Sequence, residues 1–416
     1  MIGFTKIKAG AIQYVLVVSI IIMIVLFAFI SLVYLQNRIK IKSEVYKTAI
    51  DNSYLAVDYL SQKEIPYESK KEFRFTDFEG ENTTLIKKRW GIFDIAIATS
   101  KINNERFEKI AIIGNNWKNR KALYLQDNNQ PLKIVGDTQI IGDALLPKKG
   151  VSTGSIAGTS YYGEKLIYGD VKVSSSRLPI IRNLEYIRNL TQEVLLENYK
   201  SFNLEEEIEV QRSFNKETFL FKTSNDLILA NMKLQGNIVL VSTSKIRVFP
   251  TASLEHVILI APEVVIESSF KGSLQVFSTK KIEVKNTVKL NYPSGLTVIE
   301  GSLNQDEKNE KIIIRNGADV RGVILYHNKD KKSDYNTQVL IEGNSKVKGE
   351  VFCNKNLELQ GTVEGYVYTN SFIARQFGGV YINHIYNGKI DSKAIPEQYT
   401  GLFIGEINPT VAKWID

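Results

Sequence analysis

The chain has few of the residues that supply cross-links and reactive side chains. Its 416 residues include one cysteine, Cys353, and three histidines, His256, His327 and His384. A single thiol excludes an intrachain disulfide and any metal site built from several cysteines. Only 9 residues are proline and the composition is otherwise ordinary, so the sequence indicates a folded chain without long disordered segments.

Motifs of the common enzyme classes are also missing. There is no phosphate-binding loop, no serine elbow and no zinc-binding helix. The adjacent aspartates and the Gly-His-Gly expected of a polysaccharide-processing β-helix are absent as well. We therefore predict no catalytic residue, no cofactor and no metal ion. One surface stays open as a candidate, namely His327 with Asp330 and Asp334, if the fold brings these side chains together.

An excess of acidic residues is absent too, because the formal net charge is +8. The lysines and arginines are scattered through strand-like segments, which is typical of a solvated basic surface. Attraction to lipid head groups, anionic glycans or nucleic acid is the alternative. No nucleic-acid-binding motif supports it.

What the chain does have is a long uncharged stretch near its N-terminus. No charged residue occurs from Ala9 to Asn37. At about 1.5 Å per residue, a helix from Tyr14 to Leu35 would be about 33 Å long, which is enough to cross a bilayer core. The block is longer than a secretory signal peptide needs, and no small-residue cleavage site follows it. We predict a single-pass anchor, Tyr14 to Leu35, in a bacterial cytoplasmic membrane.

The helical pattern continues beyond the apolar stretch. Neither glycine nor proline occurs between Gln36 and Pro66. Apolar residues recur at helical spacing and predict one helix over 11–66, the second half of which packs on a folded domain. The expected packing stripe is Ile39, Tyr46, Ile50, Tyr54, Val57 and Leu60.

Basic residues flank both ends of the anchor, so charge alone does not settle its orientation. The residues after it, Arg38, Lys40, Lys42 and Lys47, outnumber Lys6 and Lys8 before it and slightly favour a cytoplasmic C-terminus. Long folded domains are translocated largely regardless of charge. We therefore expect the C-terminal domain to be extracytoplasmic.

The N-terminus resembles type IV pilins and pseudopilins. Gly3-Phe4-Thr5 and then Lys6 to Ala11 form a basic leader that ends in glycine and precedes an unbroken apolar helix. The resemblance implies a leader over 1–10, processing between Gly10 and Ala11, and assembly with other envelope or pilus-like proteins. The sequence departs from the family at the fifth mature position, where Val15 stands in place of the usual glutamate.

Short β-like runs follow over 67–130, separated by turn signals such as Asn103-Asn104. They predict a small antiparallel domain that packs on the exposed half of the long helix, because a small sheet needs a partner for its apolar face. The expected strands are 72–75, 84–86, 90–97, 109–113 and 122–125.

Internal repeats dominate the rest of the chain. The segments 238–248, 257–267 and 274–284 align without gaps, each as an apolar strand, a corner and a second alternating strand. Later repeats start near Leu296, Ile324, Val351 and Val367. Coils of roughly 17 to 20 residues with short strands predict a parallel β-solenoid.

A second motif consists of two aliphatic residues and a glycine, and the spacing between the three is the same in each copy. It occurs as Ile314, Val320 and Gly322, as Ile341, Val347 and Gly349, and far upstream as Ile134, Ile140 and Gly142. Glycine at these corners permits backbone angles that other residues avoid. We place first coils at 131–178, the main solenoid at 205–390 and a C-terminal cap or tail at 391–416.

A helical stripe interrupts the coils. It consists of Ile180, Leu184, Ile187, Leu190, Val194 and Leu195. We predict an inserted amphipathic helix over 179–204 that opens with Pro179 and caps the solenoid; a binding site for a partner helix is the alternative. The predicted fold class is therefore mainly β, with one long N-terminal transmembrane helix, an antiparallel sheet domain and a parallel β-solenoid with an inserted helix.

Two consecutive coils carry polar insertions, 304–310 and 328–334. Insertions in consecutive coils emerge on one face, which in solenoids is often the binding face. Asp306, Glu307, Asp330 and Asp334 are therefore the expected partner face. A solvated insertion without a function is the alternative.

The C-terminal coils, at Val347 to Val351 and Val363 to Val367, resemble bactofilins and related polymer-forming solenoids. That resemblance implies self-association. We predict a structural or adhesive envelope protein, pilin-like in its anchor, bound to the lipid bilayer and to other envelope proteins or further copies. A membrane-tethered cytoskeletal scaffold and a polysaccharide-processing β-helix are the alternatives.

Overall fold

The computed structural model describes residues 9–77, 80–196, 209–300, 310–330 and 334–415. Strands make up 49% and helices 17% of the chain, so the protein is mainly β with one long apolar helix at its N-terminus, as predicted. The chain divides into two compact units. The first contains residues 1–57, 70–85 and 98–109, and the second contains residues 58–69, 86–97 and 110–416.

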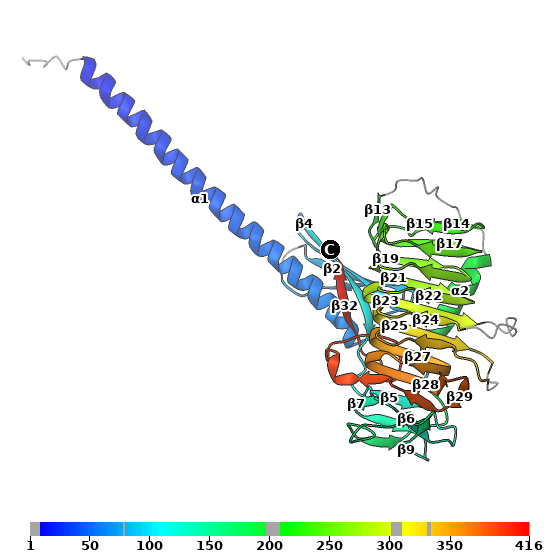
Figure 1. The fold of residues 1–416 in the computed structure, drawn as a ribbon. Coiled ribbons are helices and arrows are strands. Elements are labelled where there is room, and N and C mark those ends of the chain that lie inside the picture. Colours follow the sequence, from blue (N-terminus) through cyan, green and yellow to red (C-terminus); the bar gives the residue numbers. More distant parts are fainter. Residues whose placement is uncertain (1–8, 78–79, 197–208, 301–309, 331–333, 416) are drawn as a thin grey trace, which may run out of the picture. The chain divides into compact units, whose positions relative to one another are not determined.

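Helix α1 (Ala9–Asp58) is the main element of the first unit and is continuous (Figure 1). Its second half packs on strands β3 (Phe93–Ile102) and β4 (Glu105–Asn115). Val45 and Ala49 of the helix form a small core with Ile102 and Phe107. The helix ends before Pro66, and the short 3₁₀ helix η1 (Tyr59–Ser61) follows it in the chain.

The predicted packing stripe of this helix is only partly correct. Val57 and Leu60 are buried, but Ile39, Tyr46 and Tyr54 are 60%, 44% and 40% exposed. The buried face instead contains Val45, Ala49, Asn52 and Ser53. Hydrophobic periodicity does not predict this buried face, because Asn52 and Ser53 are polar and Ala49 is small. Asn52 can be buried because its Nδ2 donates a 2.8 Å hydrogen bond to Glu81 Oε1.

An antiparallel sheet has the strand order β1-β2-β3-β4-β32. Strands β1 (Lys70–Phe73) and β2 (Asn82–Trp90) precede β3. The strand expected at 90–97 is two strands, because a turn at Gly91, whose φ is +66°, separates Trp90 from Phe93. Strand β32 (Pro409–Ile415) pairs with β4 and is not the predicted cap or tail. No local sequence pattern predicts a pairing between strands so far apart in the chain.

The second unit contains a parallel β-solenoid with three strands per coil, which form three sides. In its middle coils, the first side carries strands with buried side chains on both surfaces, whereas β14 (Phe219–Thr223) is half-buried and β12 (Val171–Val173) is exposed. In stacking order this side contains β14, β17 (Ile238–Ser242), the later parts of β19 (Ser253–Ile260), β21 (Lys271–Ser278), β23 (Lys289–Glu300) and β25 (Asp319–Asn328), the middle of β27 (Lys346–Leu359) and β28 (Thr362–Gln376), then β5 (Leu123–Leu125), β8 (Ala144–Leu146) and β12.

The other two sides complete each coil. The second side contains β15 (Leu227–Leu229), β18 (Lys245–Val248), β20 (Glu263–Ile266), β22 (Lys281–Val284), β24 (Ile312–Ile314), β26 (Val339–Ile341) and the end of β27. The third contains β13 (Glu209–Arg212), β16 (Lys233–Gly236), the early parts of β19, β21, β23, β25, β27 and β28, then β31 (Lys389–Asp391) and β7 (Gln139–Ile141). A separate sheet has the order β30 (His384–Tyr386), β6 (Leu132–Val135) and β9 (Val151–Thr153). Near it, β29 (Gly379–Ile382) pairs with β28, and β10 (Ser155–Ile156) pairs with β11 (Thr159–Ser160).

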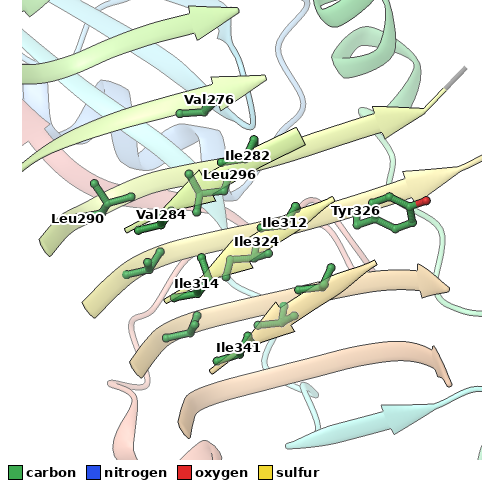
Figure 2. Packing of buried hydrophobic residues seen from close by; sticks show 14 of the residues in the cluster. Val276, Ile282, Val284, Leu290, Leu296, Ile312, Ile314, Ile324, Tyr326 and Ile341 are labelled. Carbon is green, nitrogen blue, oxygen red and sulfur yellow. The ribbon is translucent and has the colours of Figure 1, made fainter. Parts of the chain in front are cut away.

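Aliphatic columns fill the interior of the solenoid. One position of the first side holds a fully buried aliphatic residue in seven successive coils, namely Leu240, Leu259, Val276, Leu296, Ile324, Val351 and Val367. Figure 2 shows part of this column beside the columns of the second side, where Ile282 lies over Ile312 and Ile314 lies over Ile341. Each such side chain contributes about 1.5–3 kcal/mol on burial.

The predicted repeats agree with this stacking with one correction. Ile314, Val320 and Gly322 lie opposite Ile341, Val347 and Gly349, as the shared spacing predicts. In the gapless alignment Val265 should face Ile246 and Ile282, but Val264 does so. The corner at Ala261 and Pro262 is one residue shorter than its neighbours, and a corner can absorb that change without moving the strands.

Glycine is required where the third side turns into the first. Gly322, Gly349 and Gly365 stack in register, with φ values of +141°, +149° and +148°. A Cβ on Gly349 or Gly365 would lie 1.9 Å from the carbonyl oxygen of the glycine in the preceding coil. The corner therefore needs glycine both for its backbone angle and for the close approach of successive coils.

The stacking order differs from the chain order. Strand β5 pairs with β28, and β8 and β12 follow it, so the coils of 122–178 stack after the coil of 362–391 (Figure 1). Residues 122–125 were expected in the antiparallel domain, and this is wrong. Parallel pairing requires only a free strand edge and a matching apolar column. Leu123 supplies the match by continuing the column below Val367.

Helix α2 (Leu184–Leu196) lies against the outer surface of the first side and does not cap an end. Ile187 is fully buried in a cluster with Val239, Val241 and Ile258, whose side chains alternate with the interior column. The predicted helix over 179–204 is also too long at its start, since α2 begins five residues after Pro179. Its predicted end at residue 204 lies outside the described residues. The middle strands of the first side carry apolar side chains on their inner and outer surfaces, so the outer surface needs another element, here α2, to cover it.

One buried ion pair joins three distant segments of the second unit. Arg120 Nε hydrogen-bonds with Glu350 Oε1, and the Glu350 side chain is fully buried. Leu402 N donates to Glu350 Oε2 at 2.7 Å, and Arg120 Nη2 donates to Asn115 O at 2.5 Å. Burial lowers the pKa of Arg120, but the charge of Glu350 outweighs this effect, so the pKa is raised and Arg120 stays charged.

Candidate functional site

A cleft of about 720 Å³ opens beside the first side of the solenoid. One wall is formed where the first-side parts of β25, β27, β28 and β5 end, and the other is residues 176–181, which lead into α2. Tyr124 Oη fixes this second wall by donating a 2.9 Å hydrogen bond to Arg177 O. The volume is typical of small-molecule binding sites, which span about 300–1,000 Å³.

Four polar residues form a ladder along the first wall, one from each of four successive coils. They are His327, Asn354, Asn370 and Gln126, and all line the cleft. Each follows directly on a paired position of the first side, at Tyr326, Cys353, Thr369 and Leu125. Neighbouring strands lie about 4.8 Å apart, so the ladder repeats at this spacing. We call these four residues the polar ladder.

The amides of the ladder are held by hydrogen bonds. Asn354 Nδ2 donates to Asn328 O at 2.8 Å, and Asn354 Oδ1 accepts from Asn328 N at 2.9 Å. Asn128 Nδ2 donates to Asn370 Oδ1 at 3.1 Å, and Gln126 Nε2 donates to Asn128 Oδ1 at 3.3 Å. A primary amide has two donors and two acceptor lone pairs. These bonds therefore orient the side chains and leave part of their hydrogen-bonding capacity unused.

Apolar groups supplement the ladder. Phe352 lines the cleft and is 3% exposed, whereas Ile180 of the opposite wall is 82% exposed. Leu178 lines the same wall. The cleft thus offers a row of amides beside apolar surface.

Among the described residues that line the cleft, the charged ones are Arg177, Lys355, Asp330 and Asp334. Lys355 Nζ lies 3.9 Å from Asp334 Oδ2. Asp334 Oδ1 also accepts hydrogen bonds from Asn336 N at 2.9 Å and Gln338 Nε2 at 3.0 Å. Its carboxylate is therefore tied to the local turn.

His327 is neutral at physiological pH. Burial, with the nearby charges of Arg188 and Lys329, lowers the pKa of His327 from 6.5 to about 4. Its Nδ1 is buried, and among the described residues no group hydrogen-bonds with it. The imidazole therefore adds a polar but uncharged position to the ladder.

The lowered histidine pKa values predict acid sensitivity. His256, at a corner of the solenoid, also has its pKa lowered to about 4, by burial and by the charge of Lys413. A folded pKa below the unfolded value of about 6.5 makes the unfolded state bind protons first. The free energy of unfolding should therefore fall from pH 6.5 to pH 4, by about 2–3 kcal/mol for each histidine.

Urea unfolding of the full chain in detergent at pH 7.0 and 4.5, followed by tryptophan fluorescence, measures this loss. The variant His256→Gln with His327→Gln should lose about 4–6 kcal/mol less than the native chain between these pH values. An equal loss in both proteins would contradict the assignment.

The structure brings together only part of the predicted partner face. His327, Asp330 and Asp334 line the same cleft, as the sequence required for a candidate surface. Asp306 and Glu307 lie outside the described residues. Among the described residues, no group of three or more His, Cys, Asp or Glu side chains is placed to hold a metal ion.

The predicted anchor and processing residues all lie in α1. Gly10 and Ala11 are helical and exposed, and Tyr14 and Leu35 are 73% and 52% exposed. The helix is long and apolar enough to cross a membrane, and none of its most apolar 18-residue window is buried.

The amides of the ladder were missed by the sequence analysis, although a signal was present. A polar residue stands three positions after each of Ile324, Val351, Val367 and Leu123. The first three of these were identified as repeat starts, so the common offset could have been read. Leu123 could not, because its place in the stack does not follow from its place in the chain.

The chain was compared with protein-family models, with curated proteins and with solved structures. No family model, no curated protein and no solved structure matches it.

Proposed function

We propose that this protein is a membrane-anchored structural and adhesive component of the bacterial envelope, in which α1 is the anchor and the solenoid presents the cleft. The observation that carries the proposal is the exposed apolar surface of α1. Large side chains such as Met23, Phe27 and Ile30 are about 70% exposed, at 70%, 73% and 68%. Leaving this much apolar surface in water is costly, and a bilayer removes the cost.

A pilin-like role is the finer form of this proposal. A helix whose first half is apolar and whose second half packs on antiparallel strands is the arrangement that the pilin resemblance implies. The packing of Val45 and Ala49 on Ile102 supports it. The absence of the family's glutamate, with Val15 in its place, points to a minor or tip subunit rather than a main filament subunit.

A cytoplasmic scaffold is the second candidate. The basic residues Arg38, Lys40 and Lys42 directly follow the apolar stretch and favour retention of the C-terminal side in the cytoplasm. Stacked coils would serve as a rigid spacer in either compartment.

Protease treatment of intact spheroplasts tests the proposal and separates the two candidates. The full chain with a C-terminal tag is expected in the membrane fraction, with its tag removed by external protease. The mass of the N-terminus in the same fraction should match cleavage after Gly10. A tag that is protected until the cells are lysed would support the scaffold and reject the pilin-like role.

The matched control is a double substitution in the centre of α1, Ile22→Lys with Val25→Lys. Each lysine costs about 2.5–3.5 kcal/mol at the bilayer centre. The control protein should move to the soluble fraction. A native chain that is itself soluble would overturn the anchor.

A further inference from the structure

We propose that the cleft binds a neutral oligosaccharide laid along the solenoid axis, with one sugar unit beside each position of the polar ladder. The inference deepens the proposed adhesive function by naming the class of ligand. It rests on the chemistry, the spacing and the charge of the cleft.

The hydrogen-bonding groups of the cleft match those of a sugar. A hydroxyl both donates and accepts a hydrogen bond, and a primary amide does the same with two donors and two lone pairs. Asn354 and Asn370 are held in place by Asn328 and Asn128 and keep part of this capacity. His327 adds an uncharged polar side chain to the lining. Such groups suit a ligand that is rich in hydroxyls.

The spacing of the ladder indicates a repeating ligand. Its four positions recur once per coil at about 4.8 Å, which is close to the length of one sugar unit in an extended chain. Leu178 and Ile180 provide apolar surface for the C–H faces of the rings. A single sugar would contact only one or two of the four positions, so affinity should grow with chain length up to about four units.

The two aspartates that line the cleft disfavour polyanions as the preferred ligand. Proteins that bind nucleic acid or acidic polysaccharides present an excess of basic groups to neutralise their ligand. Here Arg177 and Lys355 are matched by Asp330 and Asp334, and Lys355 lies 3.9 Å from Asp334.

An extended peptide fits the cleft less well. Peptides bind to solenoids and sheets by adding a strand to a free edge, through main-chain hydrogen bonds. The main-chain groups beside the ladder already pair between coils, as in the 3.0 Å bond from Gln126 N to Thr369 O. Binding in the cleft must therefore rely on side chains, and amides favour hydroxyls there.

Calorimetric titration of the full chain in detergent tests the proposal. The probes are β-1,4-linked oligomers of glucose and of N-acetylglucosamine with two, four and six units, with tetragalacturonate as the anionic comparison. At least one neutral series should bind, with affinity rising from two to four units and little further to six. Failure of both neutral series, or tighter binding of tetragalacturonate, would overturn the proposal.

Asn370→Ala locates the site. It should raise the Kd for the tetramer about tenfold, as expected when one or two hydrogen bonds are lost. The matched control is Asn286→Ala, at an exposed asparagine outside the cleft, which should leave the Kd unchanged. If Asn370→Ala lowers the thermal midpoint, Ile180→Ala replaces it, because Ile180 is 82% exposed and its truncation spares the core.

Ile180→Ala should raise the Kd about threefold, in proportion to the apolar contact that is lost. Unchanged affinity in both cleft variants would place the sugar elsewhere and reject the site. These outcomes are separate from the membrane test, because a chain that fails to bind sugar would still be recovered from the membrane if the anchor is correct.

Discussion

Replacing Glu350 by alanine is expected to lower the free energy of unfolding by about 3–5 kcal/mol, because it leaves Arg120 charged and without its partner in the protein interior. Arg120 is 9% exposed, and its guanidinium lies 5.5 Å and 5.6 Å from the rings of Tyr366 and Tyr399. The variant also removes the acceptor of the Leu402 N–H.

A nearby surface glutamate provides the matched control. Glu364 lies in the next coil and pairs with Lys346 at 2.6 Å, but the side chain of Lys346 is 49% exposed. Exposed pairs contribute about 0.2–1 kcal/mol, so Glu364→Ala should cost less than 1 kcal/mol. Urea unfolding of the full chain in detergent compares the two. A cost for Glu350→Ala as small as that of the control would contradict the buried pair.

The double variant Arg120→Met with Glu350→Leu separates the cost of an unpaired charge from the value of the pair. Because two apolar side chains of similar volume leave no buried charge, the double variant should be more stable than Glu350→Ala alone. The three segments that meet at Glu350 would then be held by packing.

Replacing Gly349 by alanine should have an effect of similar size, of about 3 kcal/mol or more, or prevent folding. The new Cβ would lie 1.9 Å from Gly322 O and 2.8 Å from Tyr399 Oη, and φ at this position is +149°. A residue forced into such a backbone region costs about 1–3 kcal/mol before any clash is counted. The adjacent coil must move as well, and this would displace the core residues that it contributes to the aliphatic columns.

Gly343→Ala is the control for this substitution. No atom lies within 4 Å of the position that its Cβ would take, and its φ is not in the left-handed region. Alanine there should be neutral or stabilise the protein by about 0.4–1 kcal/mol. If both variants unfold at the same urea concentration as the native chain, the glycine corner is not needed for coil stacking.

The coil of the solenoid could be predicted because its sequence pattern lies within a short stretch of the chain. The spacing of Ile314, Val320 and Gly322 repeats within one coil length, and the structure places those residues in register with their counterparts. The same periodicity held the signal for Asn354 and Asn370. Sequence reasoning found His327 and both aspartates of the cleft because an insertion marks them.

What the sequence could not show are the pairings between distant segments. Nothing in the local pattern of Leu123 distinguishes a strand of a meander from a strand that continues a column below Val367. The pairing of Trp414 with Ala111 and the place of α2 on the first side have the same cause. In each case the partner is chosen by a free edge or an uncovered apolar face, which exists only once the rest has folded.

The mismatch between chain order and stacking order has a consequence for synthesis. Leu123 leaves the ribosome well before Val367, the residue on which it stacks, because 244 residues separate the two positions. At a synthesis rate of roughly 5–20 residues per second, about 12–50 s pass between the synthesis of Leu123 and that of Val367. During that time the apolar edges of the early coils are unprotected, so export factors or chaperones that bind nascent chains would have to shield residues 122–178 until translation reaches the last coil.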